Sequence, residues 1–128
     1  MQIRLMLLLL ASALLFGCAE ASGQVSSITP EELLSEAPAN ALILDVRSEQ
    51  EYGGGHVPGA INLPHDELEN RLIELDDEKE RPLIVYCESG RRAGQAESIL
   101  IGAGFSDVRH LEGDMRAWRA AGRPTATP

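Results

Sequence analysis

A cysteine that directly follows an apolar run is the residue of this sequence whose setting most favours chemistry. The run over residues 83–86 stops at Cys87, and the next five residues are polar or small. They are Glu88, Ser89, Gly90, Arg91 and Arg92. Since a structural cysteine lies among apolar neighbours, we expect this thiol to be presented to solvent and not packed in the core.

The composition of this segment predicts an anion cradle around a reactive thiol. Gly90 and Gly94 allow the backbone to turn tightly, so that the amide N–H groups of residues 88–92 can face the sulfur. The positive end of the helix that follows and the charges of the two arginines act in the same direction. Such surroundings lower the pKa of a cysteine thiol from about 8.5 to a range of about 3.5 to 7.5. We therefore predict that Cys87 is a nucleophile that carries a covalent intermediate.

Strands and helices alternate in the segments that must position this cysteine. Short apolar runs predict strands over residues 41–44, 60–63, 83–86 and 108–111. A capping box at Thr29 predicts a helix, and a second one at Ser48 predicts a one-turn helix or a tight loop. Further helices are predicted to begin at Asp66 and to span residues 93–103 and 114–121. The strands are too apolar for a sheet with one solvated face. We predict an α/β fold, a small three-layer domain with a mainly parallel central sheet and helices on both faces.

Parallel sheets of this kind bind ligands at the carboxyl ends of their strands, which is where Cys87 falls. Asp45 and Arg47 lie at the end of an earlier strand and are candidates for supporting the same site. A structural ion pair between them is the simpler interpretation, because a buried charge needs a partner. We expect them to support the site without taking part in the reaction.

The first residues of the chain predict an export signal. Arg4 precedes an apolar run over residues 5–16, which is shorter than the roughly 20 residues of a permanent membrane span. Two cleavage sites remain open, since residues 15–18 resemble a bacterial lipoprotein box and residues 19–21 read Ala-Glu-Ala. We favour lipidation of Cys18, which would place an exported, periplasmic protein on a bacterial membrane through a lipid anchor.

The remaining sequence is sized for one domain. Of the 128 residues, we assign 1–17 to the signal peptide, 18–24 to a flexible leash, 25–123 to the domain and 124–128 to a frayed tail. The formal net charge of −9 argues against nucleic acid as a partner. No C-x-x-C motif and no spaced histidine cluster is present, so we predict no metal site.

The motif C-x-x-G-x-R, from Cys87 to Arg92, resembles the active-site loop of the rhodaneses, a family of sulfurtransferases. Further similarity covers nearly all of the chain after the export signal, in segments 44–47, 51–52, 56–62 and 111–113 and at Trp118 and Gly122. By size, the chain is most similar to the single-domain exported members. Asp114 departs from the family pattern, which often has glycine there, and Glu88 adds a negative charge that could weaken the attraction for a doubly negative donor.

The resemblance implies the rhodanese fold and a transfer of sulfur in two steps. The Cys87 thiolate attacks the outer sulfur of a donor such as thiosulfate, sulfite leaves, and a persulfide remains on the cysteine. A thiol, cyanide or an accepting protein then removes that sulfur. The resemblance implies no cofactor, because the donated sulfur travels on the cysteine itself. The resemblance assigns residues 88–92 to the loop that binds substrate and persulfide, with Arg92 bracing the loop or binding the donor.

Three other functions compete with this interpretation. A phosphatase of the related Cdc25 type would have arginine at the sixth residue after the cysteine, whereas Ala93 stands there. A thiol–disulfide oxidoreductase is disfavoured because no resolving cysteine lies near Cys87. A sulfur carrier without turnover, or a binding module, remains the open alternative, because sequence does not separate a carrier from an enzyme.

Overall fold

The computed structural model describes residues 23–128, so the predicted signal peptide, Cys18 and most of the predicted leash lie outside the described residues. Five strands form one sheet in which all pairs are parallel, in the order β1-β5-β4-β2-β3. The strands are β1 (Ser26–Ile28), β2 (Leu42–Asp45), β3 (Ile61–Asn62), β4 (Leu83–Tyr86) and β5 (Val108–Leu111). The most apolar strand, β4, therefore lies at the centre, as its burial requires.

Residues 23–128 also form five α-helices and one 3₁₀ helix, of which all but the last, α5, lie between strands along the chain. They are α1 (Pro30–Ser35), α2 (Glu49–Gly53), α3 (Leu68–Arg71), η1 (Leu72–Glu78), α4 (Arg91–Gly102) and α5 (Asp114–Ala120). Both predicted capping boxes are present, at Thr29 and Ser48. The cap predicted at Asp66 is wrong, because α3 begins after Glu67 and has no side-chain cap.

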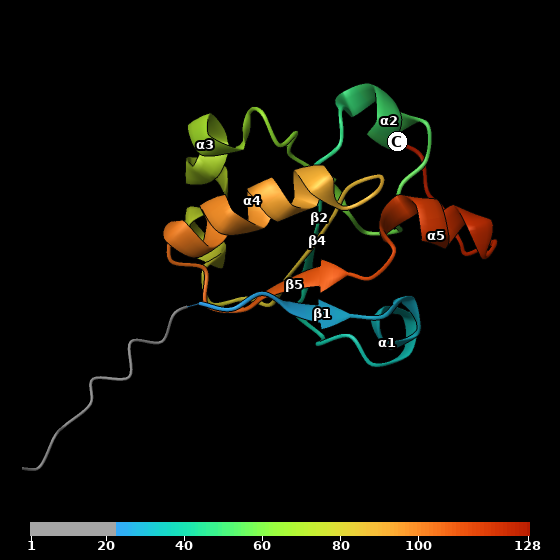
Figure 1. Ribbon diagram of the computed structural model, residues 1–128, viewed down its shortest axis with the longest axis horizontal. Coiled ribbons are helices and arrows are strands. Elements are labelled where there is room, and N and C mark those ends of the chain that lie inside the picture. Colours follow the sequence, from blue (N-terminus) through green and yellow to red (C-terminus); the bar gives the residue numbers. More distant parts are fainter. Residues whose placement is uncertain (1–22) are drawn as a thin grey trace, which may run out of the picture.

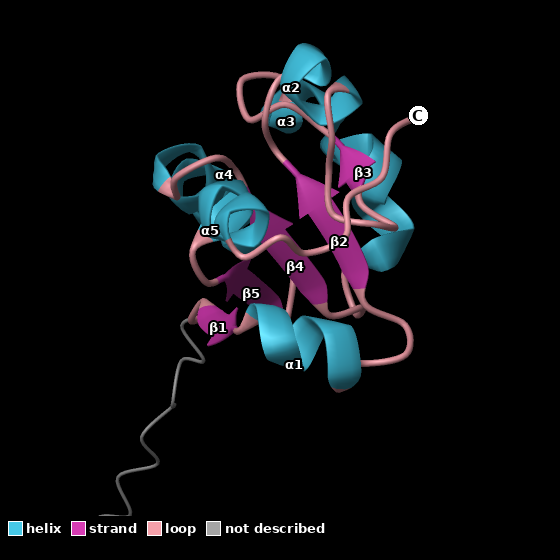
Figure 2. Ribbon diagram, turned by 90° about the vertical axis from the view of Figure 1, so that its right-hand side faces the viewer, coloured by secondary structure: helices cyan, strands magenta, loops and turns pink. Residues whose placement is uncertain are grey.

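Helices cover both faces of the sheet, which confirms the predicted three-layer α/β fold. On one face, α3, η1 and α4 pack with Leu68, Leu75 and Leu100 against the sheet. On the other, α1 and α5 pack with Leu33 and Trp118. Figure 2 shows α1 and α4 on opposite sides of the sheet. The carboxyl ends of the parallel strands meet at one edge, where the loop after β4 emerges.

Two segments differ from the sequence-based expectation. The edge strand β1 was not predicted, because its Ser-Ser-Ile sequence has no apolar pattern and its pairing with β5 comes from distant residues. The tail predicted to be frayed is held in place. Ala126 pairs with His56 in an antiparallel bridge, and the indole N–H of Trp118 donates to the carbonyl oxygen of Pro124 at 2.7 Å. Figure 1 shows the C-terminal segment running beside α2.

Within residues 23–128, no helix is both long enough and apolar enough to cross a membrane.

Candidate active site

Cys87 follows β4, and residues 87–92, which we call the sulfur loop, lead from this strand into α4. The helix begins at Arg91, two residues earlier than predicted, so both arginines lie in its first turn. Gly90 precedes the helix with a φ of 109°, a left-handed conformation that glycine adopts without strain. The tight turn predicted at this glycine is thus confirmed.

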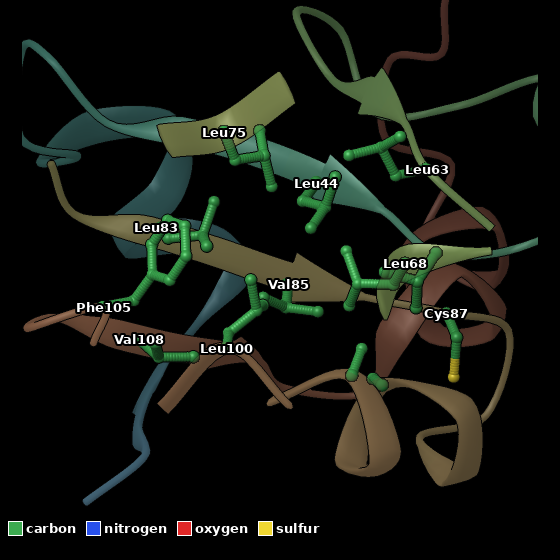
Figure 3. Packing of buried hydrophobic residues seen from close by; sticks show 13 residues of the cluster. Leu44, Leu63, Leu68, Leu75, Leu83, Val85, Cys87, Leu100, Phe105 and Val108 are labelled. Atoms are coloured by element: carbon green, nitrogen blue, oxygen red, sulfur yellow. The ribbon is translucent and has the colours of Figure 1, made fainter. Parts of the chain in front are cut away.

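The sulfur lies inside the loop. Cys87 is only 1% exposed, so the expectation of a thiol presented to solvent was wrong. The reason is strand periodicity, because Leu83, Val85 and Cys87 share the face of β4 that α4 covers. Figure 3 places Cys87 at the end of this row of buried side chains, with its sulfur toward the first turn of α4.

One backbone amide of the predicted cradle donates to the sulfur. The N–H of Gly90 lies 2.9 Å from Sγ of Cys87. The amide of Cys87 itself is directed elsewhere and donates to Oδ1 of Asp114 at 3.0 Å. The Gly94 N–H donates to the carbonyl oxygen of Gly90 and closes the first turn of α4. Among the amides of residues 88–92, the N–H of Gly90 is therefore the one that forms a hydrogen bond with the sulfur.

Arg92 braces the loop through a carboxylate that was not assigned to the site from the sequence. Its guanidinium donates to both carboxylate oxygens of Glu51, at 2.7 and 2.9 Å. The hydrogen bonds from Arg92 lower the pKa of Glu51 to about 2. The sequence had identified Glu51 as part of the capping box with Ser48, a role that it also fills, and as part of a segment that resembles the rhodanese family, but not as a residue of the site. α2 is thereby fixed to the start of α4.

Glu88 is neutralised by two arginines. Arg119 of α5 forms an ion pair with its carboxylate, and Arg47 lies 3.6 Å from it. The negative charge expected to repel an anionic donor is thus compensated at close range. We call Glu51–Arg92 and Glu88–Arg119 the solvent-side pairs. Of the remaining predicted loop residues, Ser89 and Arg91 are exposed.

Asp45 and Arg47 form the predicted ion pair, with 2.8 Å between Oδ2 and Nη2. Both side chains are buried, and Arg47 also donates to the carbonyl oxygen of Gly55. Burial by itself would lower the pKa of Arg47. The hydrogen bonds and the charge of Asp45 outweigh burial, so that the pKa of Arg47 is raised above its usual value. The Tyr86 hydroxyl donates to Asp45 at 2.6 Å, and its burial beside this carboxylate raises the pKa of Tyr86. Because Arg47 also faces Glu88, the pair supports the loop as well as the strand end.

Two pockets flank the sulfur loop. The larger, of about 660 Å³, is lined on its polar side by Arg47, Glu88, Arg119 and Arg123. The second, of about 460 Å³, is bordered by Arg92 together with residues of α2 and the segment before α3. Cys87 lines neither pocket. Guanidinium groups thus lie on both sides of the loop, next to carboxylates that also line the pockets. These carboxylates are Glu51 and Glu88 in the larger pocket and Glu49, Asp66 and Glu67 in the second.

The comparison with known protein families decides what kind of domain this is. The family model for the rhodanese-like domain matches residues 29–121. The chain belongs to the rhodanese-like family. Thiosulfate sulfurtransferase GlpE of Pseudomonas savastanoi is 32% identical over 93 residues, which cover 73% of this chain and 86% of that protein. Such relatives support sulfurtransferase activity for this rhodanese-like domain.

Related domains also occur in other settings. An HTH-type transcriptional regulator of Mycobacterium tuberculosis is 41% identical over 100 residues, which cover 77% of this chain but 43% of that protein. Among solved structures, a rhodanese-related protein from Thermoplasma volcanium has a TM-score of 0.71 at 28% identity and covers 80% of this chain and 99% of that one. The rhodanese-like fold of this chain is thus shown by both sequence and structure.

Proposed function

We propose that this rhodanese-like protein is a thiosulfate-type sulfurtransferase that carries sulfane sulfur as a persulfide on Cys87. The observation that carries the proposal is the sulfur loop itself, in which the Gly90 N–H donates to Sγ of Cys87 at 2.9 Å. A backbone donor in this position favours negative charge on the sulfur and on a sulfur atom bound to it. The thiosulfate sulfurtransferase among the relatives supports the choice of donor.

The proposed reaction has two displacements at sulfur. The thiolate of Cys87 attacks the outer sulfur of thiosulfate, the sulfur–sulfur bond of the donor breaks, and sulfite leaves with the electron pair. An acceptor, which is cyanide, a thiol or a cysteine of another protein, then attacks the outer sulfur of the persulfide. The bond between the two sulfur atoms breaks and Cys87 is regenerated as a thiolate, so no external oxidant or reductant is consumed.

The charges around the loop have separate tasks in this proposal. Arg92 holds the start of α4 against α2 through its hydrogen bonds to Glu51. Arg119 and Arg47 hold Glu88 and provide cations beside the larger pocket. Because Cys87 is 1% exposed, the donor reaches the sulfur when a side chain above the loop moves aside. The exposed Arg119, at 48%, is the partner most easily released.

The same burial favours one alternative, a sulfur carrier that passes its persulfide to a protein without rapid turnover of small donors. A protein acceptor can open the loop through contacts that a small acceptor cannot make. The two functions differ in rate with free acceptors. A carrier would form the persulfide once and turn over slowly with cyanide, whereas the proposed enzyme turns over repeatedly.

The experiment that tests the proposal compares the full chain with Cys87→Ser for release of sulfite from thiosulfate in the presence of cyanide. The substitution keeps a small polar side chain but removes the nucleophile that the reaction requires. We expect turnover in the wild type and none in the variant, with unchanged circular dichroism. Turnover that survives in Cys87→Ser would contradict the proposal.

We further propose that the protein is exported and lipid-anchored through Cys18 to a bacterial membrane on the periplasmic side. Support comes from the apolar run and lipoprotein box of the sequence, which lie outside the described residues. Expression of the full chain in bacteria, followed by intact-mass analysis of the membrane fraction, tests this. We expect a mature chain that begins at an acylated Cys18. A chain cleaved after residue 21, or left uncleaved in the cytoplasm, would contradict the proposal.

A further inference from the structure

Three hydrogen bonds join the sulfur loop to the start of α5. The backbone N–H of Met115 donates to the carbonyl oxygen of Cys87 at 3.0 Å, and that of Arg116 donates to the carbonyl oxygen of Glu88 at 3.1 Å. The third bond runs in the other direction, from the N–H of Cys87 to Oδ1 of Asp114. Asp114 therefore holds, through its side chain, the backbone of the residue that would carry the sulfur.

The backbone of Asp114 adopts a conformation that glycine would adopt with less strain. Its φ is 55°, and it is the only residue other than glycine with a positive φ in the part of the chain that the structure describes. Any L-residue at this position is strained relative to glycine. The contacts of the Asp114 carboxylate must offset that strain, which indicates that the carboxylate has a task.

A charged neighbour fixes the other oxygen of this carboxylate. Nε2 of His110 lies 3.0 Å from Oδ2 of Asp114, and Nδ1 of the same ring contacts Glu97. The hydrogen bonds with Asp114 and then with Glu97 raise the pKa of His110 to about 10. At neutral pH the ring is therefore a cation between two carboxylates. We call Glu97, His110 and Asp114 the interior charge cluster.

The interior charge cluster connects the elements that surround the loop. Glu97 belongs to α4, which follows the loop, His110 to β5, and Asp114 to the first turn of α5. A methyl group added at Gly90 would lie 3.2 Å from Oδ2 of Asp114. Asp114 thus borders both Cys87 and Gly90, the residue whose amide touches the sulfur.

We propose that Asp114, held by His110 and Glu97, is a positioning residue that fixes the backbone of the sulfur loop for transfer at Cys87. It acts through the amide of Cys87 and touches neither donor nor acceptor. This inference rests on the proposed function where it is tested by the kinetics of sulfur transfer. Its second test, the rate at which Cys87 is alkylated, depends only on the geometry of the loop. Together the two readouts separate a failure of positioning from a failure of the reaction.

The kinetic test uses two substitutions at the same residue. Asp114→Gly suits the positive φ and removes the acceptor for the Cys87 N–H, whereas Asp114→Asn keeps an oxygen acceptor. We expect kcat for sulfur transfer to fall about tenfold in Asp114→Gly, as for the loss of one bond to a buried donor. In Asp114→Asn we expect kcat within about threefold of wild type, because the bond is retained. The denaturation midpoint of Asp114→Gly should fall, because the buried Cys87 N–H and the charged His110 each lose a partner. Circular dichroism under the assay conditions must therefore show that the variant is folded when kcat is measured.

The matched control is Asp107→Asn. Asp107 lies just before β5 and forms an ion pair with Arg109 of that strand, away from the loop. We expect it to leave kcat unchanged. A wild-type kcat in Asp114→Gly would overturn the positioning role. So would an equal loss in Asp114→Gly and Asp114→Asn, because the acceptor oxygen would then not be the feature that matters.

The second readout is the alkylation of Cys87 by iodoacetamide in the native protein, which needs no sulfur transfer. A loop released from Asp114 exposes a sulfur that is otherwise 1% accessible. We expect alkylation of Asp114→Gly to be about tenfold faster than in wild type while transfer is slower, and Asp107→Asn to match wild type. Equal alkylation rates in wild type and Asp114→Gly would overturn the inference. If the wild type forms no persulfide, the proposed function fails, but faster alkylation of the variant still supports positioning.

Discussion

Two groups of charged side chains lie around the sulfur loop, and their carboxylates differ in their contact with water. In the interior charge cluster, the side chains of Glu97 and Asp114 are 9% and 4% exposed, and that of His110 between them is 24% exposed. In the solvent-side pairs, the four side chains are between 25% and 48% exposed. Charges in contact with water are screened and exchange partners readily, whereas buried charges keep theirs. We infer that the interior cluster and the bidentate Glu51–Arg92 pair fix the loop. The Glu88–Arg119 pair, whose arginine is 48% exposed, can yield to an anionic substrate.

The largest effect is expected at Arg92, because it is the arginine that fixes the loop from the solvent side. Arg92→Ala removes both hydrogen bonds to Glu51 and leaves that carboxylate charged beside the loop. We expect kcat/KM for thiosulfate to fall roughly tenfold to a hundredfold, as for the loss of a bidentate charged contact. The circular dichroism spectrum should not change.

Arg92→Lys is the matched control, since it keeps the charge but not the bidentate geometry. Its kcat/KM should lie between those of Arg92→Ala and wild type. Wild-type kinetics in Arg92→Ala would show that the pair with Glu51 has no part in the reaction.

A pH titration of stability distinguishes the interior cluster from the solvent-side pairs. The pKa of His110 is raised from 6.5 to about 10 in the folded state. The stability gained from this cation is fully present below pH 6.5 and is lost as the pH rises through 10. We expect the free energy of unfolding of the wild type, measured with denaturant, to fall over this interval relative to that of His110→Gln. Parallel curves for the two proteins would mean that folding does not raise the pKa of His110.

The smallest effect is expected at Glu88, because its pairing is the most exposed to solvent. Glu88→Gln removes a negative charge beside the larger pocket and releases Arg119. We expect KM for thiosulfate to fall about threefold with kcat unchanged, in line with the modest strength of exposed ion pairs. Steady-state kinetics at low ionic strength measures this most sensitively. Arg119→Ala should raise KM, and a change of the same sign in both variants would contradict the assignment.

The parts of the fold that follow from local sequence were predictable. The apolar run at β4 and the capping box at Ser48 depend on neighbouring residues, and both appear as expected. The edge strand β1 depends on pairing with β5, at the other end of the chain. The docked tail likewise depends on His56. Contacts between distant segments leave little local pattern to read.

The site shows the same division. The turn at Gly90 followed from residue type and spacing, whereas the burial of Cys87 did not. The polar residues after Cys87 suggested exposure, but the strand alternation that precedes it turns its side chain toward α4. Glu51 and Asp114 enter the site through contacts that span much of the chain. For Glu51 the sequence offered a capping box and a segment that resembles the rhodanese family, and for Asp114 a departure from glycine.

The most direct test of the central claim is intact-mass analysis of the full chain before and after incubation with thiosulfate, followed by peptide mapping. The account predicts a gain of one sulfur atom on Cys87, release of an equal amount of sulfite, and removal of the added sulfur by cyanide. Cys87→Ser should show no gain. An unchanged mass of the wild type, or an added sulfur on any other residue, would contradict the account.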